Sequence, residues 1–346
     1  MTGRRHLVVD LAGTSRNWAL PPDGGERIRA NVPAGWDVTI VRSLAPAWGE
    51  AGSAASQEAV AAVGDAEAYF GFGLTPELFA AAPALRWVHS AAAGVGSSLF
   101  PAVRASDLVF TNSAGVMGTP IAEHVLAGVL HFLRELDVAA ELQRLGVWDK
   151  APFVGEGSRV RELCECRVVV FGTGGVGAAI AARFAALGAH CTGIRRRPDL
   201  GVPQGFDDVT GMDGLDAALR GADVVVLAAP LTPDTRDVLS AARLDCLPAG
   251  AIVVNVARGA LLDERALAER LSRGEIRGAV LDVFRDEPLP PESPLWRVRG
   301  VLITPHVAAV SPRLFWRRAL DLFLENWQRY AHGEPLRNVV DKETGY

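Results

Sequence analysis

Three polar residues each follow a short apolar run in the second half of the chain. Arg258 lies in NVARGALLDE, Glu287 in LDVFRDEPLP and His306 in TPHVA. The carboxyl ends of neighbouring parallel strands form the ligand crevice of an open sheet, so we expect these three side chains to share one cleft. Taken singly, each has an ordinary alternative: Arg258 and Glu287 as solvated loop charges, and His306 as a capping or packed histidine.

A guanidinium, a carboxylate and an imidazole beside a nicotinamide would suit the reduction of a 2-keto acid. Arg258 could bind the substrate carboxylate as a fork and polarise the neighbouring carbonyl. His306 could donate a proton to the carbonyl oxygen while hydride reaches the carbon. Glu287, placed against the other ring nitrogen, would fix the tautomer and favour the protonated ring.

A dinucleotide site is predicted by FGTGGVG at residues 171–177. The loop follows an apolar run and opens a helical segment of small residues, whose first N–H groups would face a pyrophosphate. The alternative is a glycine turn in some other α/β unit, but the strand-to-helix context favours the cofactor. The expected cofactor-binding residues of this loop are Gly172, Gly174, Gly175, Val176 and Gly177.

The strand after such a loop normally ends in a carboxylate, about twenty residues on, that binds the adenosine ribose hydroxyls. Here that place holds Arg195, Arg196 and Arg197. A cation cannot accept a hydroxyl proton, but a guanidinium can bind a 2′-phosphate. We therefore predict that NADP(H) is preferred, that NAD(H) is also accepted, and that reduction is the working direction. The alternative is a solvated loop of arginines.

Two alternating series of strand and helix patterns must position these residues. Apolar runs at 6–12, 36–43, 66–72 and 85–90 alternate with Ala-, Glu- and Arg-rich stretches, which predicts parallel strands with crossover helices. The second series is apolar on both faces, as in a sheet covered by helices. Its runs are 167–172, 190–194, 222–230, 250–257, 277–283 and 300–306.

The predicted class is α/β with two domains, since 346 residues exceed the usual size of a single core. We expect a Rossmann-like doubly wound cofactor domain over 119–312 and a flavodoxin-like substrate domain over 1–118, completed by 313–346. A helical pattern of nearly thirty residues, with Thr119 as N-cap, would join them. From Pro312 one amphipathic helix should run to Gly333.

Composition narrows the classes of partner. The net charge of −5 disfavours nucleic acid, and no run approaches the ~20 apolar residues of a membrane span. The opening MTGRRHLVVDLAG has only a short apolar run, interrupted by Asp10, so we expect a cytoplasmic protein without a secretory signal. No metal is expected, because the cysteines lack the paired spacing of a metal site. They are Cys164, Cys166, Cys191 and Cys246.

The motifs GTGGVG, PLTPDTRDVL, NVARGALLDE, LDVFRDEPLP and TPHVA, in this order, resemble the D-isomer-specific 2-hydroxyacid dehydrogenases over nearly the whole chain. The resemblance implies that Arg258, Glu287 and His306 are the catalytic trio. It further implies that Asp282 holds the nicotinamide carboxamide. Three residues would line the cofactor: Pro230, Thr235 and Val256.

In that family the first sheet forms the substrate domain, and two copies pair through the cofactor domain. The resemblance therefore implies that this protein is a homodimer. The loop HSAAAGVG would offer backbone N–H groups of Ala92, Ala93 and Gly94 to the substrate carboxylate, and His89 beside it would be packed.

The substrate is expected to be small or apolar, because GFGLTPELF offers no cation for a phosphate. Phe72 could form a wall of the site. Glyoxylate or hydroxypyruvate is the first choice, and longer branched 2-keto acids stay open. The rival class is a dinucleotide-gated, corepressor-like binding protein with little turnover.

Overall fold

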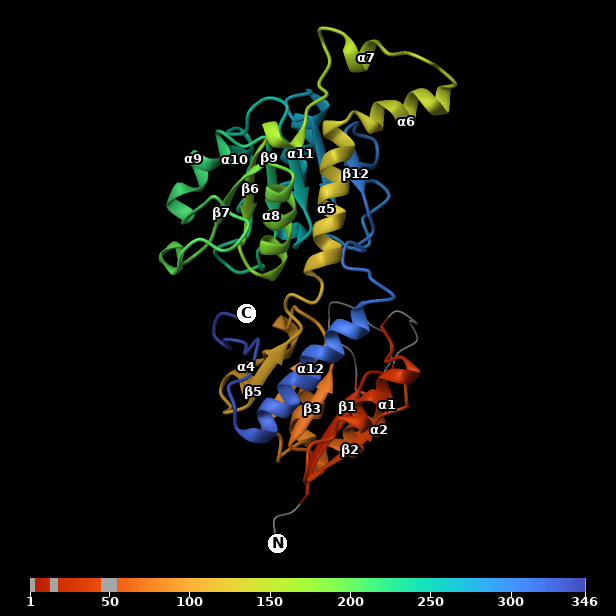
Figure 1. Cartoon of the computed structure of the whole chain (residues 1–346), viewed down its shortest axis with the longest axis vertical. Coiled ribbons are helices and arrows are strands. Elements are labelled where there is room, and N and C mark those ends of the chain that lie inside the picture. The colour runs from red at the N-terminus through yellow and green to blue at the C-terminus, as the bar shows by residue number, and fades with distance from the viewer. Residues whose placement is uncertain (1–3, 13–17, 45–54, 346) are drawn as a thin grey trace. The chain divides into compact units, whose positions relative to one another are not determined.

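The computed structural model describes residues 4–12, 18–44 and 55–345, and the chain divides into two compact units. The first unit comprises Met1–Met117 and Val310–Tyr346, and the second comprises Gly118–Ala309. Each unit is built on one parallel sheet, which confirms the predicted α/β class (Figure 1). Among the described residues no helix is long and apolar enough to cross a membrane.

The sheet of the first unit has the strand order β2-β1-β3-β4-β5, all parallel. This is the flavodoxin order, as predicted. The fifth strand was not predicted. The strands are β1 (Arg5–Asp10), β2 (Trp36–Ile40), β3 (Ala68–Gly71), β4 (Trp87–Ser90) and β5 (Val109–Asn112).

The C-terminal helix α12 returns to this first sheet and completes its core (Figure 1). It spans Phe315–His332 and ends at Gly333, whose φ of 71° is the left-handed geometry that favours glycine at a helix end. Phe323 of α12 stacks on Phe70 at 3.9 Å and on Trp87 at 5.8 Å between ring centroids. The other helices of this unit are α1 (Pro22–Ala30), α2 (Gln57–Ala62), α3 (Pro76–Ala81) and α4 (Pro101–Arg104).

The sheet of the second unit has the order β12-β11-β10-β9-β6-β7-β8, again all parallel. The order reverses between β6 and β9, which is the switch point where doubly wound sheets bind dinucleotides. The strands are β6 (Arg167–Phe171), β7 (His190–Ile194), β8 (Asp208–Thr210), β9 (Val224–Leu227), β10 (Ile252–Asn255), β11 (Gly278–Leu281) and β12 (Val301–Ile303).

Helices accompany the strands of this second sheet, and α5 packs closely on α8. A Cβ atom at Gly118 would lie 2.9 Å from the carbonyl oxygen of Gly175, so only glycine allows this approach. The helices are α5 (Gly118–Leu133), α6 (Leu136–Leu145), α7 (Ala151–Val154), α8 (Gly175–Ala186), α9 (Leu215–Leu219), α10 (Ala241–Leu244) and α11 (Glu264–Ser272).

The single long helix expected after residue 118 is instead two helices, α5 and α6. Glu135 between them has a left-handed φ of 56° and is buried. Its carboxylate accepts from Arg277 at 3.1 Å, and Arg277 also donates two hydrogen bonds to Asp137 at 2.9 and 2.7 Å. A distant arginine therefore stabilises the turn. The helix also begins at Gly118, so Thr119 lies in its first turn and is not the N-cap.

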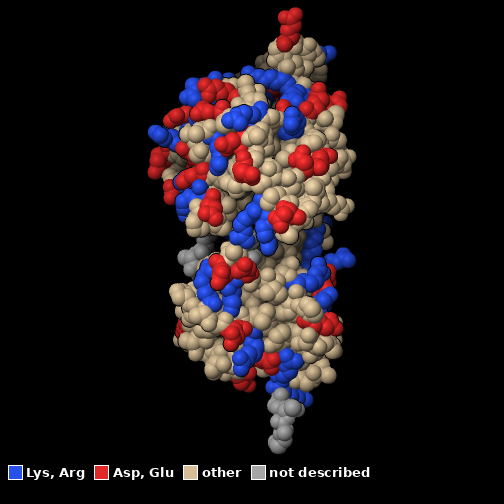
Figure 2. Space-filling view, turned by 90° about the vertical axis from the view of Figure 1, so that its left-hand side faces the viewer, with Lys and Arg blue, Asp and Glu red and all other residues tan. Residues whose placement is uncertain are grey.

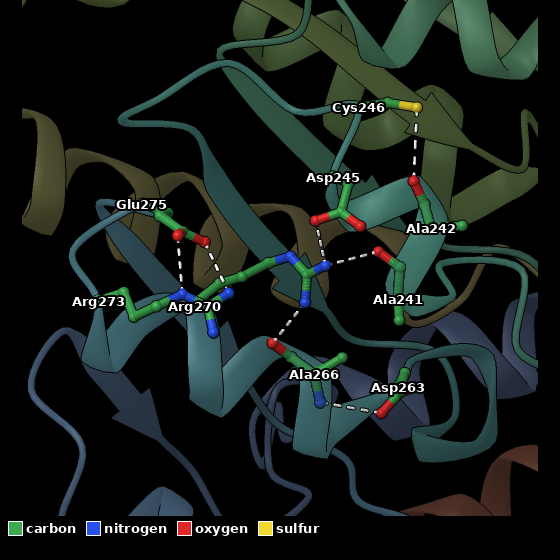
Figure 3. A network of polar contacts seen from close by, with 9 residues as sticks. All are labelled: Ala241, Ala242, Asp245, Cys246, Asp263, Ala266, Arg270, Arg273 and Glu275. Carbon is green, nitrogen blue, oxygen red and sulfur yellow. Dashed lines mark hydrogen bonds and ion pairs between the residues drawn. The ribbon is translucent and has the colours of Figure 1, made fainter.

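A buried arginine ties α10 to α11 (Figure 3). The Arg270 guanidinium donates to the carbonyl oxygens of Ala266 at 3.1 Å and Ala241 at 2.9 Å, and it pairs with Asp245. At the other end of α11, the Asp263 side chain caps the helix by accepting from the Ala266 N–H at 3.0 Å. These bonds fix the helix that follows the β10 loop.

His89 is buried on β4, in line with its interpretation as a packed residue. Its Nδ1 lies 2.8 Å from Thr111 Oγ1, and burial lowers the pKa of the ring to about 3. The unfolded chain binds a proton on this ring below pH ~6.5, whereas the folded chain does so only near pH 3. His89 therefore makes the folded state less stable as the pH falls through that window.

We expect this loss to be measurable by urea unfolding. Between pH 7 and pH 5 the wild type should lose about 2 kcal/mol more stability than His89→Leu, because one pH unit corresponds to ~1.4 kcal/mol for one proton. Parallel pH dependences of the two proteins would show that the ring is protonated in the folded state.

Candidate active site

The turn from β6 into α8 requires glycine at two positions. Gly172 has a φ of 102°, and a Cβ atom there would lie 2.8 Å from the backbone of Ala229. A Cβ atom at Gly177 would lie 1.9 Å from the Gly172 carbonyl oxygen. The loop therefore closes tightly between β6 and the end of β9, at the switch point of the sheet.

Gly174, the middle glycine, faces open space. A Cβ atom at this position would have no described atom within 4 Å, and no side chain caps the helix N-terminus. Gly175 and Val176 are the first two residues of α8, where backbone N–H groups have no partner within the helix. Space and unpaired donors at a helix N-terminus fit the pyrophosphate of a dinucleotide.

Arg195 lies directly beside this loop. It follows Ile194, the last residue of β7, whose carbonyl oxygen accepts from the Gly172 N–H at 2.9 Å. The Arg195 N–H donates to Thr210 of β8 at 3.1 Å, and its Nη1 donates to the Gly201 carbonyl oxygen at 3.3 Å. The guanidinium thus comes from the strand end where an acidic residue would bind the ribose hydroxyls.

The loop after β9 is held by hydrogen bonds of its own threonine side chains. Thr235 Oγ1 donates to the Pro230 carbonyl oxygen at 2.8 Å and accepts from the Thr232 N–H at 2.7 Å. Next to this loop, the Val256 N–H donates to Leu227 of β9 at 3.4 Å. Pro230, Thr235 and Val256 therefore lie at the carboxyl ends of β9 and β10, and the Thr235 side chain shapes the loop.

Arg258 follows β10, and a hydrogen bond to its backbone holds it in place. Asn255 Nδ2 donates to the Arg258 carbonyl oxygen at 2.9 Å, while the Arg258 side chain is exposed and donates to Ala257 at 2.7 Å. A Cβ atom at Gly259 would lie 1.9 Å from the backbone carbon of Phe284. Gly259, the residue after Arg258, therefore lies against the loop after β11, which carries Glu287.

His306 and Glu287 form a pair. His306 Nδ1 lies 2.8 Å from Glu287 Oε2, and the other carboxylate oxygen accepts from the Phe284 N–H at 2.9 Å. Both side chains are partly exposed. The carboxylate thus fixes the ring through Nδ1, and Nε2 has no hydrogen bond among the described residues, so it is the nitrogen that can serve a ligand.

Asp282, at the end of β11, is only 2% exposed and contacts the loop that carries His306. Its carboxylate accepts three hydrogen bonds, from the Thr304 hydroxyl, the Val307 N–H and the Ala308 N–H. A carboxylate has about four acceptor sites, so these three hydrogen bonds use most of them. Sequence reasoning missed these partners, although Thr304 stands in the TPHVA motif.

The loop after β4 in the first unit offers fewer free donors than expected. The Ala92 N–H donates to Ser90 Oγ at 3.1 Å, so it is already used within the loop. The N–H groups of Ala93 and Gly94 have no partner in the part of the chain that the structure describes. The Ala93 carbonyl oxygen accepts from Asn112 Nδ2 at 2.7 Å, which anchors the loop on β5.

The glycine loop at the switch point, with an imidazole–carboxylate pair and an arginine on the same sheet edge, defines a dinucleotide-dependent oxidoreductase. Among residues 4–12, 18–44 and 55–345, no group of three His, Cys, Asp or Glu side chains could hold a metal ion.

Acidic and basic side chains are interspersed over the face in Figure 2.

Comparison with known proteins agrees with this class. Residues 126–308 match the model of the "D-isomer specific 2-hydroxyacid dehydrogenase, NAD binding domain" family. The chain is 35% identical to glyoxylate/hydroxypyruvate reductase A of Salmonella newport (strain SL254) over 232 residues, 66% of this chain and 70% of that protein.

Two solved structures are similar over nearly the whole chain. A D-isomer specific 2-hydroxyacid dehydrogenase of Xanthobacter autotrophicus Py2, in complex with NADPH and MES, has a TM-score of 0.79 and 33% identity, covering 98% of this chain and 99% of that one. An NADPH-dependent glyoxylate/hydroxypyruvate reductase of Sinorhizobium meliloti, in complex with NADP and sulfate, has a TM-score of 0.77 and 28% identity, covering 99% and 100%.

The chain belongs to the D-isomer specific 2-hydroxyacid dehydrogenase family. It is an NAD(P)-dependent oxidoreductase with a nicotinamide dinucleotide cofactor.

Proposed function

We propose that this protein reduces a small 2-keto acid to the D-2-hydroxy acid with NADPH as the preferred cofactor. The observation that carries the proposal is the His306–Glu287 pair at 2.8 Å, next to the Arg258 loop and at the carboxyl ends of three adjacent strands. An acid, its support and an anion-binding cation then meet on the edge that binds the cofactor.

The residues of this chain divide the work as follows. The bound nicotinamide supplies hydride. Arg258 binds the substrate carboxylate and polarises the carbonyl oxygen, which gains negative charge during reduction. His306 donates a proton from Nε2 to that oxygen, since Glu287 holds Nδ1. Ala93 and Gly94, in the first unit, are also proposed as substrate-binding residues, because their N–H groups have no partner among the described residues.

The cofactor residues follow the geometry of the glycine loop. Gly174, Gly175 and Val176 bind the pyrophosphate at the N-terminus of α8, and Arg195 binds the 2′-phosphate, with Arg196 adding positive charge. Asp282 uses its remaining acceptor site for the carboxamide. The NADPH-bound Xanthobacter relative and the NADPH-dependent Sinorhizobium relative support the choice of NADP(H).

Glyoxylate or hydroxypyruvate is the proposed substrate, as the names of the Salmonella and Sinorhizobium relatives suggest. The loop after β3 supports a small or apolar substrate side chain. Phe72 in this loop packs edge-on against Trp18 and Trp316, with ring centroids 6.5 and 5.9 Å apart.

We place the protein in the cytoplasm, where its four free cysteines would stay reduced.

The proposal is tested by NADPH oxidation with a panel of 2-keto acids, from glyoxylate and hydroxypyruvate to branched and phosphorylated acids. We expect turnover with the small acids and little with the phosphorylated ones. Tight NADPH binding without turnover on any member would favour the corepressor-like class instead.

We also propose that the protein is a homodimer formed through the cofactor domain. The arm of α6 and α7 extends from the second unit, and none of the described residues of these helices is buried (Figure 1). Large apolar side chains on this arm are exposed, Trp148 to 91%. The others are Leu136, Leu145, Val147 and Val154. A second copy would bury them, and twofold pairing is the commonest symmetry.

Sedimentation at micromolar concentration should therefore give twice the chain mass of 36.7 kDa. The double variant Trp148→Asp/Val154→Asp should sediment as a monomer, because charges would have to be buried without partners. Leu187→Asp, at a residue exposed to 48% at the end of α8, is the matched control and should stay dimeric. A monomeric wild type would refute the dimer.

A further inference from the structure

His306 has an unusual backbone conformation for a side chain with a catalytic role. Its φ of 54° lies in the left-handed region, which is disfavoured for a residue other than glycine. The His306 N–H donates to the carbonyl oxygens of Asp282 at 2.9 Å and Thr304 at 3.0 Å. Contacts around the residue must hold this conformation, since the chain alone disfavours it.

Asp282 fastens the loop on both sides of His306. Before it, the Thr304 hydroxyl donates to Oδ1 at 2.5 Å. After it, the Val307 N–H donates to the same oxygen at 2.8 Å and the Ala308 N–H donates to Oδ2 at 2.9 Å. A buried, charge-assisted set of this kind is stronger than neutral hydrogen bonds. The ring position therefore depends on the carboxylate.

A histidine on α5 continues this chain of contacts. Because the Thr304 hydroxyl gives its proton to Asp282, it can only accept from His124 Nε2, which lies 3.2 Å away. His124 lies less than two turns from the start of α5 at Gly118, where α5 touches the first residue of α8. The hydrogen bonds thus run from α5 through Thr304 and Asp282 to the His306 loop.

We infer that His124, Thr304 and Asp282 are positioning residues that hold the His306 ring in its proton-donating place. The inference rests on the proposed function, because its effect on kcat can be measured only if the protein reduces a 2-keto acid. It predicts that the hydroxyl of Thr304 acts as a hydrogen-bonding bridge, so its removal should displace the ring while the fold and the glycine loop stay intact.

The test compares Thr304→Val, which removes the hydroxyl at nearly constant shape, with Thr304→Ser, which retains it. We expect Thr304→Val to lower kcat roughly tenfold to a hundredfold, as misplacement of a reacting group by about 1 Å does. The Kd of NADPH should change less than kcat, because the glycine loop is untouched, and the Tm should stay close to wild type. Thr304→Ser should restore most of kcat. Thr192→Val, at a partly buried β7 threonine outside this chain of contacts, is the matched control and should leave kcat unchanged.

A second readout does not need turnover. In cofactor-free protein labelled with ¹⁵N-histidine, seven rings are present and His306→Ala identifies the His306 signals. These signals should move in Thr304→Val and in His124→Leu but not in Thr304→Ser. If Thr304→Val does not fold, His124→Leu replaces it in both measurements.

The results separate the two proposals. A wild type that reduces no 2-keto acid would overturn the proposed function, while the ring signals would still decide the positioning role. Unchanged His306 signals together with more than half of wild-type kcat in Thr304→Val would overturn the inference. Equal losses in the serine and valine variants would do so too, because the hydroxyl would then be irrelevant.

Discussion

His306→Ala should lower kcat for 2-keto acid reduction by roughly 10²–10⁴-fold, the usual contribution of a general acid. The reason is that Nε2 would be lost as proton donor. The Kd of NADPH should change little, because His306 follows the edge strand β12 whereas the glycine loop follows the interior strand β6. Stopped-flow absorbance of NADPH gives kcat, and fluorescence titration gives the Kd.

Two further variants serve as controls for this result. Glu287→Gln should lower kcat less than His306→Ala, because the amide can still contact Nδ1 but lacks the charge. Arg258→Ala should affect both KM and kcat, since its guanidinium would bind and polarise the substrate. If His306→Ala retained more than about a tenth of wild-type kcat, His306 would not be the proton donor.

Arg195→Asp should reverse the cofactor preference. Loss of one charge-assisted contact to the 2′-phosphate costs about 1.5–3 kcal/mol, which is roughly a ten- to a hundredfold loss of NADPH affinity. The new carboxylate would also repel the phosphate and could accept from the ribose hydroxyls, so kcat/KM for NADH should rise toward parity. The measurement is kcat/KM for both cofactors at saturating 2-keto acid.

Arg197→Asp is the charge-matched control, because it makes the same change two residues after Arg195, further from the end of β7. It should reduce NADPH affinity less than Arg195→Asp, through the weaker field of an exposed and more distant charge. Equal kcat/KM for NADH and NADPH in the wild type would contradict the NADP(H) preference, whatever the variants did.

The apolar runs predicted the central strands because buried parallel strands have apolar residues on both faces. Two strands escaped this criterion. β8 has three residues on the sheet edge and none of them is buried, so it has no apolar run. β5 ends in Thr111 and Asn112, whose side chains bond to neighbouring loops and strands. Polar residues within short strands cannot be separated from loops by periodicity alone.

The break between α5 and α6 could not be predicted from local pattern. The residues around Glu135 continue a helical periodicity, and the left-handed turn depends on Arg277, which is far away in the chain. Tertiary contacts of this kind override local propensity.

The positions of Arg258, Glu287 and His306 were predictable because topology alone brings adjacent strand ends together. The hydrogen bonds of the residues around them were not predictable. The Ala92 N–H is taken by Ser90, and the Asp282 carboxylate bonds to the His306 loop, because both contacts depend on backbone conformations that no motif encodes.

The left-handed backbone conformation at position 306 means that a residue which raises thermal stability there is expected to lower activity. His306→Gly and His306→Ala both delete the imidazole, but only glycine adopts a φ of 54° without strain. We expect the glycine variant to be inactive but to tolerate heat at least as well as the alanine variant. Selection for thermostability alone would favour residues that relax this loop, and such residues would remove the side chain that we propose as the proton donor. Screens that raise Tm in this protein should therefore exclude position 306 and its hydrogen-bonding neighbours.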